Sequence, residues 1–244
     1  MDDRDRLREL RAAVATRNGE SLIALLQDPW PDHALQLIGD GLLDALGRDV
    51  AGAREPASVC VTALRERDWE GDEDLASALD ARLGAGATPL LRPLPVDLEQ
   101  LSGVLEGDPV AGGGGRIDLQ NGEVWPGSAI EYAIEVGDED EDEDDRERWL
   151  WVANEGSRAG YRDMERFTAS IEDPDITDRL ERALDRRGAF RRFRNQLTEW
   201  PELQSRWYAY SAERQRGRAR AWLASGGYTP TPAAPPETPA PTRP

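Results

Sequence analysis

The chain has 244 residues, of which 39% are hydrophobic and 32% are charged, and its formal net charge is -18. This length gives room for one or two domains and a sizeable core. All 30 basic residues are arginine, so the sequence excludes a P-loop lysine, a Schiff-base lysine and a pyridoxal-phosphate anchor.

The sequence has one histidine, His33, and one cysteine, Cys60, which limits the kinds of catalytic and metal site that the chain can form. One chain with these residues forms no internal disulfide and no ordinary Cys/His zinc site, and a histidine-dependent nucleophile would have to use His33. His33 lies near the start of a predicted helix, so we expect a capping or surface role. We predict no catalytic, cofactor or metal residues. We also predict no membrane partner and a cytoplasmic location, because no apolar run approaches the roughly 20 residues of a membrane span.

Residues 1–86 show apolar residues at helical spacing throughout, which predicts a helical domain. A weak similarity between Gly19–Leu26 and Gly71–Leu79 is compatible with helix-pair repeats. The five expected helices are marked by Leu7, Leu10 and Val14; by Ser21–Gln27; by Leu35, Ile38, Leu42 and Leu46; by Val59, Ala63 and Leu64 after Pro56; and by Leu75, Leu79 and Leu83.

Prolines 89, 93 and 95 predict a linker and domain boundary at 87–96. The second domain is expected at 97–224, with Asp97 capping a short helix that runs through Leu105. This organisation predicts an α+β protein that is mainly helical.

The second domain carries the signals of a small antiparallel sheet. Arg116–Leu119 and Glu123–Trp125 flank an Asn-Gly turn, which predicts a hairpin. Ala129–Val136 alternates as a strand does, although the segment is also compatible with a helix, and Trp149–Ala153 is a further expected strand. We expect the C-terminal helices to pack on one face of this sheet.

Four helices are predicted between Arg158 and Leu223, joined by short turns that require them to pack together. Asp173-Pro174 starts the second, Gly188 follows it, and Pro201 starts the fourth. In the first helix Arg162, Asp163 and Arg166 are expected to point away from the core. The expected apolar stripes are Tyr161, Met164, Phe167 and Ile171; Ile176, Leu180, Ala183 and Leu184; Phe190, Phe193 and Leu197; and Leu203, Trp207 and Tyr210.

Several short motifs occur in the order found in one bacterial family. They are Asp97-Leu98-Glu99 with Leu105, Ile117-Asp118-Leu119 with Gly122-Glu123-Val124, Tyr161-x-x-Met164-x-x-Phe167, Gly188-Ala189-Phe190-Arg191-Arg192-Phe193, Trp207-Tyr208 and Trp222-Leu223. From about 96 to 223 the chain therefore resembles uncharacterised protein family 0158. The resemblance implies no activity, cofactor or catalytic residue, and residues 1–92 and the proline tail have no obvious counterpart in the shorter members.

Two segments are expected to lack regular structure. Asp138–Asp145 is a run of eight carboxylates within a predicted acidic loop at 137–147, which mutual repulsion should keep solvated. It lacks the glycine of an EF-hand loop. The proline-rich segment 225–244 is predicted to be a disordered tail, with a ligand for a polyproline-binding domain as an alternative.

The interval 186–220 contains ten arginines against three glutamates, a local net charge of +7 in a chain of net charge -18. Guanidinium groups bind carboxylates or phosphates in forked pairs and stack on aromatic rings. The candidate anion-binding or partner-binding residues are therefore Arg191, Arg192, Arg194, Trp207 and Tyr208. The alternative is that these arginines pair with carboxylates of the chain itself.

The sequence favours a non-enzymatic binding or regulatory protein with an unidentified protein partner. A nucleic-acid-associated protein that uses the 186–220 interval is the first alternative. An enzyme that uses carboxylate, arginine or tyrosine chemistry is the second alternative, since the 48 acidic residues supply many candidate pairs.

Overall fold

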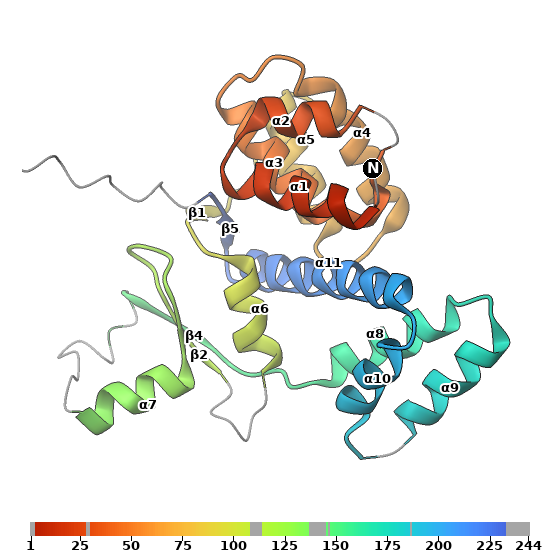
Figure 1. Ribbon diagram of the computed structural model, residues 1–244. Helices are drawn as coiled ribbons and strands as arrows, with labels where there is room; N and C mark the ends of the chain where they lie inside the picture. Colours follow the sequence, from red (N-terminus) through yellow and green to blue (C-terminus); the bar gives the residue numbers. More distant parts are fainter. Residues whose placement is uncertain are drawn as a thin grey trace, which may run out of the picture.

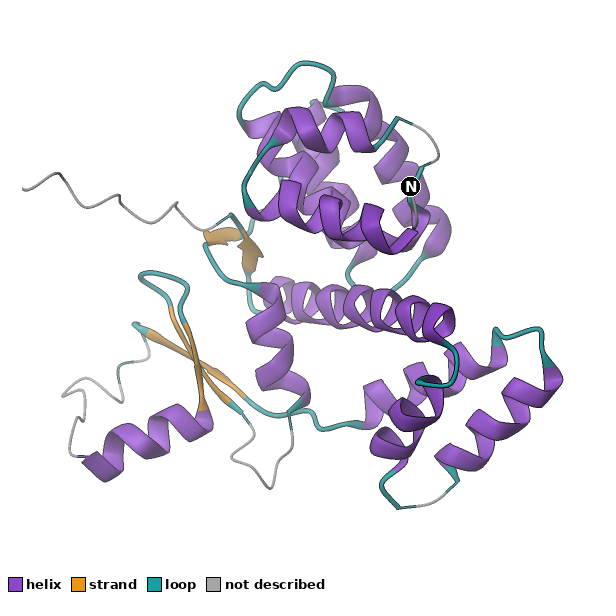
Figure 2. Ribbon diagram, viewed as in Figure 1, coloured by secondary structure: helices purple, strands orange, loops and turns teal. Residues whose placement is uncertain are grey.

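The computed structural model describes residues 3–27, 30–107, 114–136, 145, 147–185 and 187–232. The helices are α1 (Asp3–Ala15), α2 (Gly19–Leu25), the 3-10 helix η1 (Asp32–Ala34), α3 (Leu35–Gly47), α4 (Arg54–Arg67), α5 (Asp72–Leu83), α6 (Leu98–Glu106), α7 (Gly127–Val136), α8 (Arg158–Ala169), α9 (Pro174–Leu184), α10 (Ala189–Leu197) and α11 (Pro201–Ser225). The strands are β1 (Arg92–Leu94), β2 (Gly115–Asp118), β3 (Val124–Pro126), β4 (Trp149–Val152) and β5 (Tyr228–Pro230). Figures 1 and 2 show the mainly helical α+β architecture that the sequence predicts.

Helices α1 to α5 confirm the five helices expected before residue 86, and their apolar faces meet in one N-terminal core. Leu10, Leu22, Ile38 and Leu75 are among its fully buried members. None of the described residues of α11 belongs to this core. One expected core residue is misplaced: Val59 is 45% exposed, because the buried stripe of α4 is Ala57, Cys60, Val61 and Leu64 at i, i+3, i+4 and i+7.

The three-stranded sheet has the order β3-β2-β4 and is antiparallel throughout. Both predicted strands of the hairpin and the strand from Trp149 are confirmed, and the turn between β2 and β3 uses Gly122 at φ +78°.

The strand reading of Ala129–Val136 is wrong, and the helical alternative is confirmed as α7. Strand geometry would have placed Ile130, Tyr132 and Ile134 on one face. On the helix only Ile130 turns inward, at 8% exposed, while Tyr132 and Ile134 are 65% and 47% exposed.

The sheet packs against α6 and the C-terminal end of α11. This sheet core joins Ile117, Val124 and Val152 of the strands to Leu101 of α6 and Leu223 of α11. The expectation that all the C-terminal helices cover the sheet is corrected, because α8, α9 and α10 bury their apolar faces in a separate C-terminal core. That core comprises Met164, Phe167, Leu180, Leu184, Ala189, Phe193, Leu197, Leu203 and Trp207.

A short parallel pair of strands was not anticipated. Strand β1 lies inside the predicted linker, and β5 lies inside the segment predicted as a tail, with Arg92 opposite Tyr228. The Arg92 guanidinium also lies 4.5 Å from the centroid of the Tyr228 ring. The acidic residues 138–144 and the tail residues 233–244 lie outside the described residues.

Helix α11 is the long helix between the N-terminal helices and the rest of the molecule (Figure 1). Its first half contributes Leu203 and Trp207 to the C-terminal core, and its second half contributes Ala219 and Leu223 to the sheet core. On the side of the N-terminal helices its backbone approaches that of α5 closely. A Cβ atom added at Gly71 would lie 2.1 Å from the Gly217 carbonyl oxygen.

Candidate functional site

The second half of α11 carries arginine at every other position, at residues 214, 216, 218 and 220. Two residues along a helix correspond to about 200° of rotation, whereas four residues return to nearly the same face. Arg214 and Arg218 therefore lie on one side of α11, and Arg216 and Arg220 lie on the opposite side. Each side meets carboxylates from a different part of the chain.

The first side pairs with α8 and α6. Arg214 Nε lies 3.0 Å from Asp163 Oδ1, and Arg218 Nη1 lies 2.7 Å from Asp163 Oδ2. Arg218 Nε also donates to Glu106 Oε1 at 2.6 Å. Asp163 is 1% exposed, so the expectation that it points away from the core is wrong. The two guanidinium groups supply the opposite charge that lets this carboxylate be buried.

The second side pairs with α3. Arg216 Nη1 donates to Asp40 Oδ2 at 2.9 Å, and Arg220 donates to Asp40 and, at 2.9 Å, to Gln36 Oε1. Although burial opposes it, the Asp40 carboxylate contributes to a raised pKa of Arg216. Arg220 is 2% exposed, so its charge serves internal pairing.

Glu213 lies between these arginines and caps the start of α3. Its carboxylate accepts hydrogen bonds from the backbone N–H of Gln36 at 2.7 Å and of Leu37 at 3.2 Å, and from Arg67 Nη1 at 3.0 Å. Burial raises the pKa of Glu213, while Arg67 and the two backbone donors oppose that rise. Arg67 also forms a two-pronged pair with Asp72, with distances of 2.9 and 2.7 Å. This polar network joins the N-terminal helices to α11.

The five residues predicted to bind an anion or a partner do not gather in one place. Arg191 and Arg194 of α10 are exposed. Arg192 instead donates to the backbone carbonyl of Ala183 in α9 and to that of Arg187, which precedes α10. Trp207 is 6% exposed and stands edge-on to Phe167 and Phe193, at centroid distances of 5.2 and 4.9 Å. Tyr208 is 49% exposed and lines a separate cleft.

Phe190 departs from the expected core stripe of α10. It is 37% exposed, whereas Phe193 and Leu197 are fully buried. Its ring contacts the position of Gly160 on α8, where an added Cβ atom would lie 3.3 Å away. Phe190 therefore faces α8 while part of its surface stays exposed, and its carbonyl oxygen accepts a hydrogen bond from Arg194 Nε at 3.4 Å.

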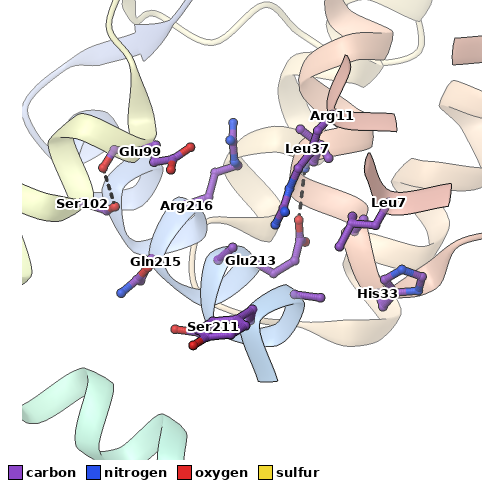
Figure 3. A pocket seen from close by; sticks show the side chains of 14 residues that line it. Leu7, Arg11, His33, Leu37, Glu99, Ser102, Ser211, Glu213, Gln215 and Arg216 are labelled. Atoms are coloured by element: carbon purple, nitrogen blue, oxygen red, sulfur yellow. Dashed lines mark hydrogen bonds between the residues drawn. The ribbon is translucent and has the colours of Figure 1, made fainter. Parts of the chain in front are cut away.

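The cleft beside Tyr208 has a volume of about 420 Å³ and lies between α1, η1, α6 and α11 (Figure 3). Side chains from segments far apart in the sequence line it, among them Arg11, His33, Glu99, Tyr208, Ser211 and Arg216. The sequence reasoning missed Arg11, Glu99 and Arg216 because no local motif links α1, α6 and α11. The exposed aromatic Tyr208 was the one signal in the sequence.

Cys60 is fully buried in the N-terminal core, and burial raises the pKa of its thiol. Among the residues that the structure describes, no three His, Cys, Asp or Glu side chains are grouped so as to hold a metal ion. Within the same ranges, none of the helices combines the length and apolar character of a bilayer-crossing segment.

Comparison with known proteins supports the family resemblance. The model of the Uncharacterised protein family (UPF0158) matches residues 132–234, so the match begins within α7 and includes β4 and helices α8 to α11. The "UPF0158 protein PA5073" of Pseudomonas aeruginosa is 30% identical over 133 residues, which cover 54% of this chain and 84% of that relative. No solved structure matches the chain. The chain therefore belongs to the uncharacterised protein family UPF0158.

Proposed function

We propose that the protein is a non-enzymatic binding protein that uses the exposed face of α10 to engage an acidic segment of another protein. Arg191 and Arg194 are three positions apart, so they lie on the same face of the helix. Neither forms an ion pair with any residue that the structure describes. Phe190 lies beside them and is 37% exposed. Guanidinium groups next to a partly exposed aromatic ring suit an acidic peptide that also carries an apolar side chain.

The internal pairing of α11 favours a protein partner over a nucleic acid. Of the ten arginines between 186 and 220, Arg214, Arg216, Arg218 and Arg220 are each bound to a carboxylate of the same chain. A nucleic-acid backbone requires several free cationic groups along its path. The face on α10 offers a smaller positive surface on a molecule of net charge -18, which suits a short acidic segment.

The experiment compares the double variant Arg191→Glu/Arg194→Glu with the wild-type protein. The control is Arg158→Glu/Arg162→Glu, which makes the same charge change at exposed positions of α8. The probe is a labelled peptide rich in Asp and Glu with one Phe, titrated by fluorescence anisotropy at two salt concentrations. We expect the α10 variant to weaken peptide binding at least tenfold and the α8 control to bind as the wild type does.

Labelled single-stranded RNA and duplex DNA are titrated in parallel. Salt-sensitive RNA or DNA binding that disappears in the α10 variant, without peptide binding, would replace this proposal by the nucleic-acid alternative. Equal peptide binding by the α10 variant and the α8 control would remove α10 as the binding surface.

A further inference from the structure

We propose that the cleft between α1, η1, α6 and α11 is a binding site for a small organic anion that carries a planar ring. This site is separate from the exposed face of α10 and does not depend on the function proposed for that face. The structure brings two arginines and the exposed ring of Tyr208 to one hollow of about 420 Å³, and Figure 3 shows the two arginines, Arg11 and Arg216. That volume lies at the small end of the range for pockets that bind organic ligands.

The charge of the cleft is set by which of its ionic groups already have a partner. The Glu213 carboxylate in its wall is bound by Arg67 and by the N–H groups of Gln36 and Leu37, so three of its roughly four acceptor positions are occupied within the protein. Arg216 uses Nη1 for Asp40, and a guanidinium group has five N–H donors in all. Arg11 of α1 forms no ion pair with a described residue. The cleft therefore retains cationic hydrogen-bond donors from two helices.

Glu99 is the second carboxylate in the lining, and it also opposes this charge. It lies on the first turn of α6 and is exposed, on the opposite side of the cleft from α1 in Figure 3. An anionic group held between Arg11 and Arg216 leaves Glu99 to accept a hydrogen bond from a hydroxyl or amino group elsewhere on the ligand. The arrangement thus selects a ligand with an anionic end and a hydrogen-bond donor.

Tyr208 supplies the preference for a ring. Its side chain is 49% exposed and lines the same cleft, with Ser211 one turn of α11 further on. Aromatic rings in binding sites stack on planar groups, and the neighbouring hydroxyl groups fix the orientation of the ligand. Sugar phosphates and nucleotides share the anionic group and the hydroxyls, but of the two only the nucleotides offer a planar aromatic ring to Tyr208.

The cleft also lies where two parts of the chain meet. Arg11 and His33 come from the N-terminal helices, whereas Tyr208 and Arg216 come from the region that matches the family model. A ligand in this position contacts both parts, as in many proteins whose ligands bind between domains. Its binding should therefore stabilise the junction between them.

The test measures binding to the full chain by isothermal titration calorimetry with three probes: adenosine monophosphate, inorganic phosphate and adenosine. We expect adenosine monophosphate to bind saturably and at least tenfold more tightly than either fragment. The variant Arg11→Gln should weaken that binding at least tenfold. The matched control is Arg8→Gln, since Arg8 is exposed on the same helix but pairs with Asp5 and does not line the cleft.

The variant Tyr208→Leu tests the recognition of the planar ring separately from that of the anionic group. It should weaken the binding of adenosine monophosphate by several-fold and leave that of inorganic phosphate unchanged. Circular dichroism and thermal unfolding of each variant establish that it is folded, as expected for substitutions at exposed positions. No saturable binding of any probe by the wild type, or equal binding by Arg11→Gln and Arg8→Gln, overturns the proposal.

Discussion

The arginines of α10 and those of the second half of α11 belong to one basic interval of the sequence, yet their surroundings are opposite. Arg191 and Arg194 are exposed, whereas Arg214, Arg218 and Arg220 are buried against carboxylates of the same chain. The difference lies in what faces each helix across space. A cluster of like charges along the sequence therefore becomes a binding surface only where the rest of the fold leaves it without counter-ions.

The sharpest way to test this contrast is to remove the carboxylate that two buried arginines share. The substitution Asp163→Ala leaves Arg214 and Arg218 buried with less opposing charge, and it should lower the free energy of unfolding by about 3–5 kcal/mol. Urea unfolding followed by tryptophan fluorescence measures the change. A loss below about 1 kcal/mol would show that these arginines reach water in solution.

The opposite side of α11 should respond less strongly. Asp40 and Arg216 are partly exposed, with side-chain exposures of 22% and 23%, and Arg220 keeps its hydrogen bond to Gln36 when Asp40 is changed. The substitution Asp40→Asn should therefore lower the free energy of unfolding by about 1–3 kcal/mol. The same urea titration tests the ranking, which fails if Asp40→Asn proves more costly than Asp163→Ala.

The pH dependence of Glu213 gives a further comparison. Burial raises the pKa of Glu213 in the folded protein above its value in the unfolded chain, so the folded state holds the proton more tightly. The stability that Glu213 contributes should therefore fall as pH rises from about 4.3, its unfolded value, through the raised folded pKa. Measured against Glu213→Gln between pH 4 and 8, the wild-type protein should lose relative stability over this window. A constant difference between the two proteins would contradict the raised pKa.

The smallest effect is expected on α10. The double substitution Arg191→Ala/Arg194→Ala removes two exposed side chains that form no ion pair with a described residue, so the free energy of unfolding should change by less than about 0.5 kcal/mol. Thermal and urea unfolding both measure this quantity. A loss comparable to that of Asp163→Ala would mean that α10 also carries structural ion pairs and would withdraw it as a free surface.

Local signals in the sequence were sufficient for most of the helices and strands. Asp97 and Asp173 cap α6 and α9 as their side chains and positions predict, and the Asn-Gly turn gave the hairpin. These features depend on residues within a few positions of each other, so a short segment of sequence is enough to predict them.

The elements that were missed depend on partners far away in the chain. The local pattern of α8 predicts that Asp163 faces solvent. Asp163 is buried because Arg214 and Arg218, which lie 51 and 55 positions later in the chain, pair with it. Strand β1 forms only because β5 lies beside it, 136 residues further along. The cleft needs α1, α6 and α11 together, so the sequence offered Tyr208 but not Arg11 or Glu99.

The close approach of Gly71 and Gly217 has a consequence for the whole arrangement of charges. A Cβ atom added at Gly217 would lie 2.2 Å from the Glu70 carbonyl oxygen, just as one added at Gly71 would collide with Gly217. Two backbones in such contact prevent α11 from sliding along its axis or rolling against α5. A shift of one residue would move the guanidinium groups of Arg214, Arg216, Arg218 and Arg220 away from their carboxylates, so two residues without side chains keep these ion pairs in register.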